Sequence, residues 1–159
     1  MVQISVTERR AGRERRVTMA KNTCEFAVGR LLEIEVAAGY QSVADVDDMI
    51  RMIGERLAAV PPNEKVVIAA DWRAVQVMAP ETGERARQML AGVNSRVKRS
   101  AILTLADHST TNLQVVRLVR EAENRDRRHF TSLPAMHAWL SEVLSPDESA
   151  RLKVFLRAP

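Results

Sequence analysis

Asp107, His108 and Ser109 are the three residue types of a hydrolytic triad, and they are adjacent in the chain. A triad works only when nucleophile, base and orienting acid converge in space, which three consecutive residues cannot easily do. The same segment is typical of a loop that follows a strand, with Ser109 or Thr110 as the cap of the next helix. The sequence offers no nucleophile–base or carboxylate pair, so we predict no catalytic residues and expect a protein that is not an enzyme.

Metal and nucleotide sites have no support in the sequence. The histidines, His108, His129 and His137, show neither an HxH nor an HExxH spacing. We expect His129 to face outward from a short strand and His137 to lie on a helix flank. Cys24 is the only cysteine, which excludes an internal disulfide or a multi-cysteine metal site. The glycines form neither a GxGxxG motif nor a P-loop. We therefore predict no metal and no cofactor.

The net charge of +4 is concentrated at the N-terminus. Residues 1–21 hold six basic and two acidic residues, whereas the rest of the chain has 18 of each. Nucleic-acid binding depends on neutralising phosphates, so we expect it only through the arm Arg9–Arg16. We interpret residues 1–22 as an Arg-rich arm, mobile or an exposed hairpin connection, which could include a short strand at Met1–Val6. The alternatives are that the arm contacts an acidic partner or anionic lipid, or that it has no specific role.

A second group of arginines occurs late in the chain: Arg117, Arg120, Arg125, Arg127 and Arg128. Acidic residues are interleaved with them: Glu121, Glu123 and Asp126. This pattern predicts a solvated helix end whose charges pair with one another, not an anion site. Aromatic residues make up only 4% of the chain, which argues against a surface that stacks single-stranded nucleic acid.

Alternating or continuous apolar runs predict strands. The first two form a hairpin in which Gly29, at the first central position of the turn, permits the positive φ of a type II′ turn. The predicted strands are Cys24–Val28, Leu32–Val36, Lys65–Ala70, Ser100–Ala106 and the shorter Arg127–Thr131.

Helical spacing of apolar residues predicts helices between the strands. Ser42, with Asp45 three residues later, is the expected cap of the first. Pro80 occupies the first turn of the second, with Glu81 and Arg85 as an exposed ion pair and Asn94 at its end. The predicted buried stripes are Val46–Val60, Ala86–Val93, Val115–Ala122 and Met136–Val143, and a capping box at Ser145 opens a last helix through Leu156.

The expected order is ββαβαβαα, with strands and helices alternating after the hairpin. Such alternation demands a largely parallel sheet with crossover helices, and the opening hairpin makes the sheet mixed. A chain of 159 residues suits one domain. We therefore predict an α/β fold with a single domain over residues 23–159 after the arm of residues 1–22.

Asp71, Trp72 and Arg73 follow a buried strand, at the edge where open α/β sheets bind ligands. Tryptophan and arginine are enriched where proteins contact partners. The sequence thus indicates a partner or ligand face that also includes Met78 and the start of the next helix. The alternative is a surface-lying Trp72 that covers the edge of the core.

The run Lys65–Asp71 followed by a loop into a helix at Pro80 resembles the central strand–loop–helix of STAS domains, the SpoIIAA-like fold of anti-sigma-factor antagonists. The segments NSRVKRSAIL (Asn94–Leu103) and FTSLPAMHAWLSEVLSPDESARL (Phe130–Leu152) are similar to bacterial proteins labelled STAS/SEC14-like. The resemblance covers roughly residues 23–152. It implies the SpoIIAA-like fold and a regulatory role.

The resemblance has one departure. Signalling STAS domains carry an Asp-Ser-Ser-Gly motif at the start of the central helix, where a kinase phosphorylates a serine. This chain has Ala79-Pro80-Glu81-Thr82 instead. Thr82 could accept phosphate, or Glu81 could act as a fixed negative charge at a helix N-terminus. The simpler interpretation is that Glu81 is an ordinary first-turn acid paired with Arg85.

We expect a cytoplasmic, non-enzymatic STAS-like module that binds an unknown protein partner through Asp71, Trp72, Arg73, Met78, Glu81 and Thr82, and that could form a homodimer. The alternative is a carrier of a lipid-like or other small apolar ligand in a crevice at the carboxyl ends of the strands. Nucleic-acid binding through the arm is a third hypothesis. No apolar run is long enough to span a bilayer, and no signal peptide is visible.

Overall fold

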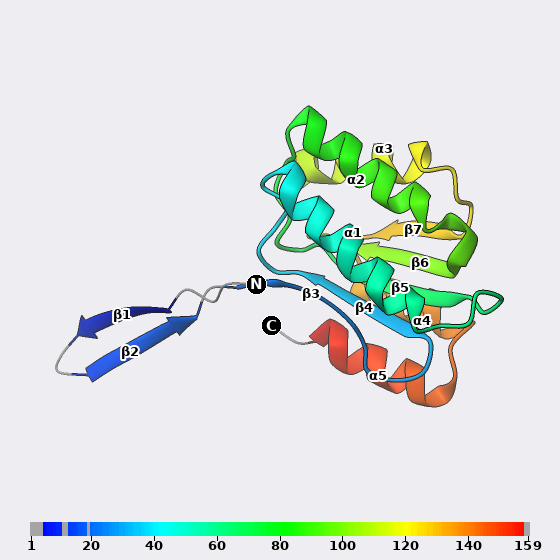
Figure 1. Cartoon of the computed structure of the whole chain (residues 1–159), viewed down its shortest axis with the longest axis horizontal. Coiled ribbons are helices and arrows are strands. Elements are labelled where there is room, and N and C mark those ends of the chain that lie inside the picture. Colours follow the sequence, from blue (N-terminus) through cyan, green and yellow to red (C-terminus); the bar gives the residue numbers. More distant parts are fainter. Residues whose placement is uncertain (1–4, 11–12, 19, 158–159) are drawn as a thin grey trace.

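The protein is seen here in a computed structural model that describes residues 5–10, 13–18 and 20–157. It is an α/β protein with a five-stranded mixed sheet, five α-helices and a separate two-stranded sheet near the N-terminus (Figure 1). The elements are β1 (Ser5–Arg10), β2 (Arg13–Thr18), β3 (Asn22–Phe26), β4 (Leu31–Val36), α1 (Val43–Ala58), β5 (Val66–Asp71), α2 (Pro80–Gly92), the 3₁₀ turn η1 (Asn94–Arg96), β6 (Val97–Leu103), α3 (Ser109–Glu121), β7 (Arg127–Phe130), α4 (Leu133–Ser141) and α5 (Pro146–Arg157).

The five-stranded sheet follows the order of the chain, β3-β4-β5-β6-β7. β3 and β4 are antiparallel, and every later pair is parallel. The predicted mixed sheet with a parallel core and crossover helices is therefore confirmed. The order within this domain is ββαβαβαβαα, one strand–helix pair longer than the expected ββαβαβαα. The additional strand is β7, at the segment expected to form a fifth, shorter strand.

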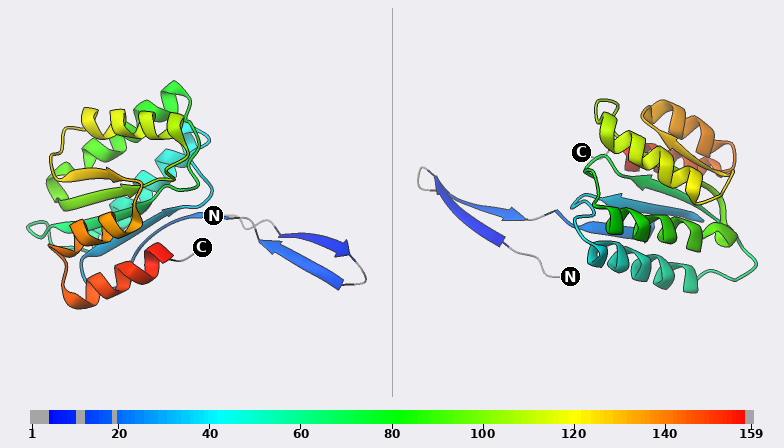
Figure 2. Two further views of the ribbon diagram at one scale, coloured as in Figure 1. Left: turned by 180° about the vertical axis from the view of Figure 1, so that it is seen from behind. Right: turned by 90° about the horizontal axis from the view of Figure 1, so that it is seen from above.

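The connections decide which helices cover which face of the sheet. Parallel neighbours are almost always joined by right-handed crossovers. Because each new strand adds on the same side of the previous one, α1, α2 and α3 all lie on one face (Figure 2). The chain after β7 adds no further strand, and α4 and α5 cover the opposite face. The sheet is thus the middle of three layers.

The central strand β5 is buried along its whole length, as its apolar sequence predicts. Its side chains alternate between the two faces. Val66, Ile68 and Ala70 belong to the core beneath α1, α2 and α3, whereas Val67 and Ala69 belong to the core beneath α4 and α5. The two faces of the sheet therefore have separate hydrophobic cores.

The capping box at Ser145 is confirmed and has an additional role. The Ser145 backbone N–H donates to Glu148 Oε1 at 2.8 Å, and the Glu148 N–H donates to Ser145 Oγ at 3.2 Å. Glu148 Oε2 also accepts the Arg30 backbone N–H at 2.6 Å, which ties α5 to the β3–β4 turn. Gly29 has φ of 59°, as its predicted place in the turn requires, and a Cβ there would collide with Glu148.

Several local predictions are corrected by the structure. β3 ends at Phe26, two residues earlier than expected, because the turn is longer. The cap of α3 is His108, with no side-chain hydrogen bond, instead of Ser109 or Thr110. α2 ends at Gly92, and Asn94 begins a 3₁₀ turn. The Ser42 cap of α1 is confirmed, since Ser42 Oγ accepts the Asp45 N–H at 3.4 Å.

The expected N-terminal arm contains the antiparallel strands β1 and β2. Of residues 5–10 and 13–18 we describe the backbone. The strand expected at Met1–Val6 overlaps β1 only at its end, and residues 1–4 lie outside the described part of the chain. Among the described helices, none has the length and apolarity needed to cross a membrane.

Candidate functional site

The expected face at Asp71, Trp72 and Arg73 is divided between opposite sides of the sheet. Trp72 is 1% exposed and packs in the core beneath α1 and α2, with its ring at right angles to that of Tyr40 and 5.4 Å away. The Trp72 N–H donates to the Leu103 carbonyl at 2.9 Å. The alternative of a surface-lying Trp72 is also wrong, because the edge of the core is closed over this ring.

Asp71 and Arg73 instead connect the end of β5 to α5 through hydrogen bonds. Arg73 Nε and Nη2 donate to the two carboxylate oxygens of Asp71 at 2.9 and 2.8 Å, and Nη2 also donates to the Leu156 carbonyl at 3.0 Å. The hydrogen bond with Asp71 raises the pKa of Arg73. This is a bidentate ion pair with little exposed surface. The two side chains pair their charges with one another, so we assign both residues a role in the stability of the fold and not in partner binding.

The remaining residues of the predicted face are also mostly enclosed. Met78 and Thr82 are buried, at 4% and 3% exposure. A kinase could reach the Thr82 hydroxyl only if the first turn of α2 opened, so we correct the expectation that Thr82 could accept phosphate. Glu81 is exposed in that turn. Its expected pairing with Arg85 is replaced, because Arg85 Nε donates to Asp47 at 2.6 Å.

Gln114 joins the loop before α2 to α3. Its Oε1 accepts the Met78 N–H at 2.8 Å, and its Nε2 donates to the Met78 carbonyl at 2.9 Å. A Cβ on Gly83 would lie 3.2 Å from Gln114 Nε2, so glycine there allows α2 and α3 to approach closely. Between the helices lies a surface groove of about 250 Å³, lined by Met78, Pro80, Gly83, Glu84, Gln114, Arg117, Leu118 and Glu121.

Exposed apolar side chains occur on the loop before α2 and on α3, outside the lining of this groove. Leu113 is 73% exposed, Val116 48% and Val77 54%. Val77 precedes Met78 in the loop, and Leu113 precedes Gln114 and lies one helical turn before Arg117. Val116 lies about 100° or more around α3 from each lining residue of that helix, so it faces away from the groove. We call the groove together with Val77 and Leu113 the α2–α3 face.

The α2–α3 face was missed in the sequence because the predicted stripe of α3 accounts only for its buried side. Val115 and Leu118 of that stripe are buried as expected. Leu113 and Val116 fall between the stripe positions. Apolar residues at such positions are the available sequence signal for an exposed apolar patch.

His129 does not face freely outward as expected. It is half-buried, and its Nε2 lies 2.6 Å from Thr104 Oγ1, while Thr104 Oγ1 donates to Asn112 Oδ1 at 2.5 Å. The single hydroxyl proton of Thr104 is used by Asn112, so His129 Nε2 donates to Thr104 and does not act as its base. Burial lowers the pKa of His129. The network joins the ends of β6 and β7 to the start of α3.

His137 lies on α4, and its ring contacts α5. His137 Nε2 lies 2.9 Å from the Ser149 carbonyl oxygen, and the hydroxyls of Ser141 and Ser149 are 2.7 Å apart. This arrangement connects α4 with α5. The Cys24 thiol is buried, and burial raises its pKa to about 12, which disfavours the thiolate at neutral pH.

Arg127 is the least expected residue of the structure. Predicted to be solvated, it is 3% exposed, and it donates to the Leu90 carbonyl at 2.8 Å and to Asn94 Oδ1 at 2.9 Å. Burial lowers its pKa to about 10, which leaves it charged at neutral pH. Leu90 lies in the last turn of α2, where the helix dipole favours a cation. Arg127 therefore anchors the C-terminal end of α2 to β7.

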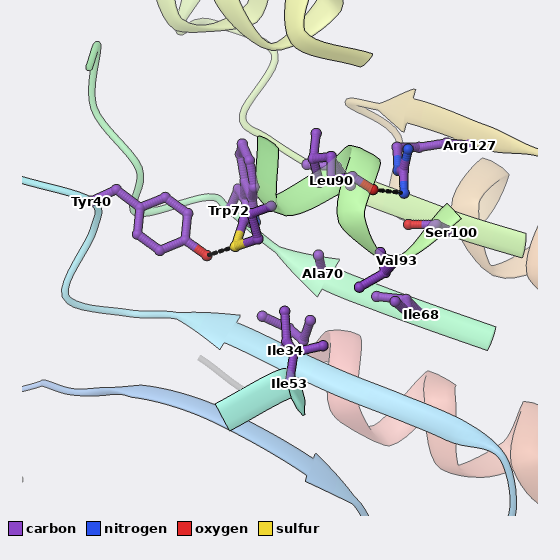
Figure 3. A pocket seen from close by; sticks show the side chains of 12 residues that line it. Ile34, Tyr40, Ile53, Ile68, Ala70, Trp72, Leu90, Val93, Ser100 and Arg127 are labelled. Atoms are coloured by element: carbon purple, nitrogen blue, oxygen red, sulfur yellow. Dashed lines mark hydrogen bonds between the residues drawn. The ribbon is translucent and has the colours of Figure 1, made fainter. Parts of the chain in front are cut away.

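A small cavity of about 20 Å³ lies between the sheet and the helices α1 and α2 (Figure 3). Tyr40 and Trp72 lie toward one end, and Ser100 and Arg127 toward the other. Arg127 Nε has no hydrogen-bond partner among the described residues. A cavity of this size accommodates about one water molecule.

No metal cluster of three or more histidine, cysteine or acidic side chains occurs in residues 5–10, 13–18 and 20–157. The chain has no match among protein-family models, curated proteins or solved structures. The protein is therefore an α/β protein with a groove of mixed polar and apolar lining between α2 and α3.

Proposed function

We propose that this protein is a non-enzymatic, STAS-like interaction module and that a protein partner docks on the α2–α3 face. The observation that carries the proposal is a pair of exposed apolar side chains, Val77 and Leu113, which are next in the chain to the groove residues Met78 and Gln114. Exposed apolar groups that border a concave surface are typical of protein-contact sites. The groove also offers Arg117 and Glu84 as polar contacts at its rim.

The fold resemblance supports this proposal. A sheet that begins with a hairpin and continues with parallel strands and crossover helices is the arrangement expected of a SpoIIAA-like domain. The proposed face includes the start of α2, where signalling members carry their phosphoserine. Here Glu81 is exposed in that turn and supplies a fixed negative charge. The interaction would therefore not depend on phosphorylation. The free thiol of Cys24 suits the cytoplasmic location that we also propose.

The experiment compares two exposed apolar positions on different sides of the molecule. A photo-crosslinking amino acid replaces Leu113 on α3 in one full-length variant and Val154 on α5, which is 60% exposed, in the other. After irradiation in cells of the source organism, we expect a discrete crosslinked product at position 113 and not at 154, identified by mass spectrometry. A product containing two copies of this chain would identify the partner as a second copy of the chain, so that the protein forms a homodimer.

Charge substitutions provide the matched control. Leu113→Glu should abolish the product formed by a crosslinker at Val77, whereas Val154→Glu should leave it unchanged. Both variants should unfold in urea within about 0.5 kcal/mol of the wild type, because both side chains are exposed. Equal crosslinking at positions 113 and 154, or none at either, would contradict the proposal.

One observation favours the carrier as a second candidate. A surface groove of about 250 Å³ between α1 and α2 shares Ile53, Met89 and Val93 with the cavity of Figure 3. Separation of these helices would join the two spaces. The cavity as it stands is far smaller than the roughly 300–1,000 Å³ of usual ligand sites. The ligand path would then run between α1 and α2, not at the strand carboxyl ends as expected.

Native mass spectrometry tests the carrier directly. For gently purified full-length protein we expect the mass of the chain or of its dimer, because the closed cavity excludes a larger ligand. An additional mass of a few hundred daltons that is released on denaturation would favour the carrier over the interaction module.

A further inference from the structure

The charged residues of the β1–β2 hairpin are unevenly distributed along its length. Its register pairs Val6 with Val17 near the open end and Arg10 with Arg13 beside the closing turn. Between them, Glu8 is opposite Arg15 and Arg9 is opposite Glu14. Across an antiparallel pair, opposite charges at facing positions are favourable and like charges at facing positions are unfavourable. The closed end therefore favours an anionic partner.

The charge of the ribbon contrasts with that of the remaining chain. Residues 5–18 hold five arginines and two glutamates, and residues 22–159 are balanced. An isolated two-stranded ribbon is only marginally stable in water. β1 and β2 form a sheet of their own, apart from the five-stranded sheet in Figures 1 and 2. The basic charge is thus presented on an element that a partner would also stabilise.

We propose that the β1–β2 hairpin is an arm that binds duplex nucleic acid through the arginines of its closed end. A two-stranded β-ribbon fits the major groove of a duplex. Residues 5–18 contain no aromatic residue, which single-strand binding by stacking would need. Their only valines are at the open end, so the sequence of the closed end offers no large apolar side chain to insert into a membrane. This proposal is independent of the α2–α3 face.

The test measures binding of the full-length protein to a fluorescently labelled duplex of 30 base pairs by anisotropy, between 50 and 200 mM KCl. Binding through five arginines predicts a slope of log K against log salt of roughly −4.5. The double variant Arg10→Gln/Arg13→Gln should reduce the slope to roughly −2.7 and weaken binding at 50 mM KCl about tenfold or more. The matched control, Arg51→Gln/Lys153→Gln, removes the same charge from exposed positions of the domain and should bind as the wild type does.

Two further probes identify the class of polyanion. Polyglutamate and vesicles with 30% phosphatidylserine are added as competitors at equal charge. The proposal is supported if the duplex binds in preference to both and the loss is confined to the Arg10/Arg13 variant. It is overturned if the duplex does not bind, if both double variants lose equal affinity, or if polyglutamate or the vesicles bind more tightly than the duplex.

Discussion

Trp72→Ala is expected to lower the free energy of unfolding by about 3–5 kcal/mol, a large fraction of the roughly 5–15 kcal/mol stability of an ordinary domain. Trp72 is among the largest fully buried side chains of the described chain. It lies where β5 ends, between the sheet and the α1–α2 layer, and packs edge-on against Tyr40. Its removal would open a large cavity in that layer, because the rigid sheet cannot collapse to fill it.

Equilibrium unfolding in urea, followed by far-ultraviolet circular dichroism, measures this effect. Val77→Ala is the control, since Val77 lies only five residues further along and is 54% exposed. Its free energy of unfolding should stay within about 0.5 kcal/mol of the wild type. A loss of less than about 1 kcal/mol for Trp72→Ala would show that the ring is not packed as described.

Arg127→Ala is the second substitution with a large expected effect, a loss of about 2–4 kcal/mol in the free energy of unfolding. It removes the shorter of two donors from each of two acceptors: the Leu90 carbonyl keeps only the Val93 N–H at 3.4 Å, and Asn94 Oδ1 keeps only Asn124 Nδ2 at 3.3 Å. It also removes the cation from the C-terminal end of α2. The substitution also removes the desolvation penalty of a buried charge. This gain offsets part of the loss in stability and limits the loss to about 4 kcal/mol.

The adjacent residue supplies the control for Arg127. Arg128 is exposed, and its guanidinium carbon lies 4.8 Å from the centre of the Trp139 ring. Arg128→Ala should therefore cost only about 0.5–1 kcal/mol, the range of an exposed cation–π contact. Urea unfolding of both variants distinguishes the two environments. Equal losses for Arg127→Ala and Arg128→Ala would mean that Arg127 does not anchor α2 from the interior.

Local patterns were sufficient to predict most elements of the domain. Strand alternation, the continuous apolar run of β5 and the capping boxes depend on interactions between residues close in sequence, such as Ser145 with Glu148. The alternation of strands and helices also implied a parallel sheet with crossovers, because few other connections are possible. Boundaries shifted by two or three residues, as at β3 and β6, because pairing with neighbouring strands determines where a strand ends.

The candidate site depended on the tertiary structure. Asp71, Trp72 and Arg73 are consecutive, yet the alternation at the end of β5 sends Trp72 into one core and joins the other two to α5. Only the packed fold shows which of them is accessible. Arg127 looks like any solvated arginine until β7 is placed beside β6 and under the end of α2.

The sequence by itself determined the α/β class, the N-terminal caps of α1 and α5 and the neutral charge of residues 22–159, since these follow from composition and short-range spacing. The tertiary structure decided which polar groups are buried and which apolar groups, such as Leu113 and Val116, remain exposed. Burial depends on contacts between segments that are distant in the chain, and no local spacing encodes them.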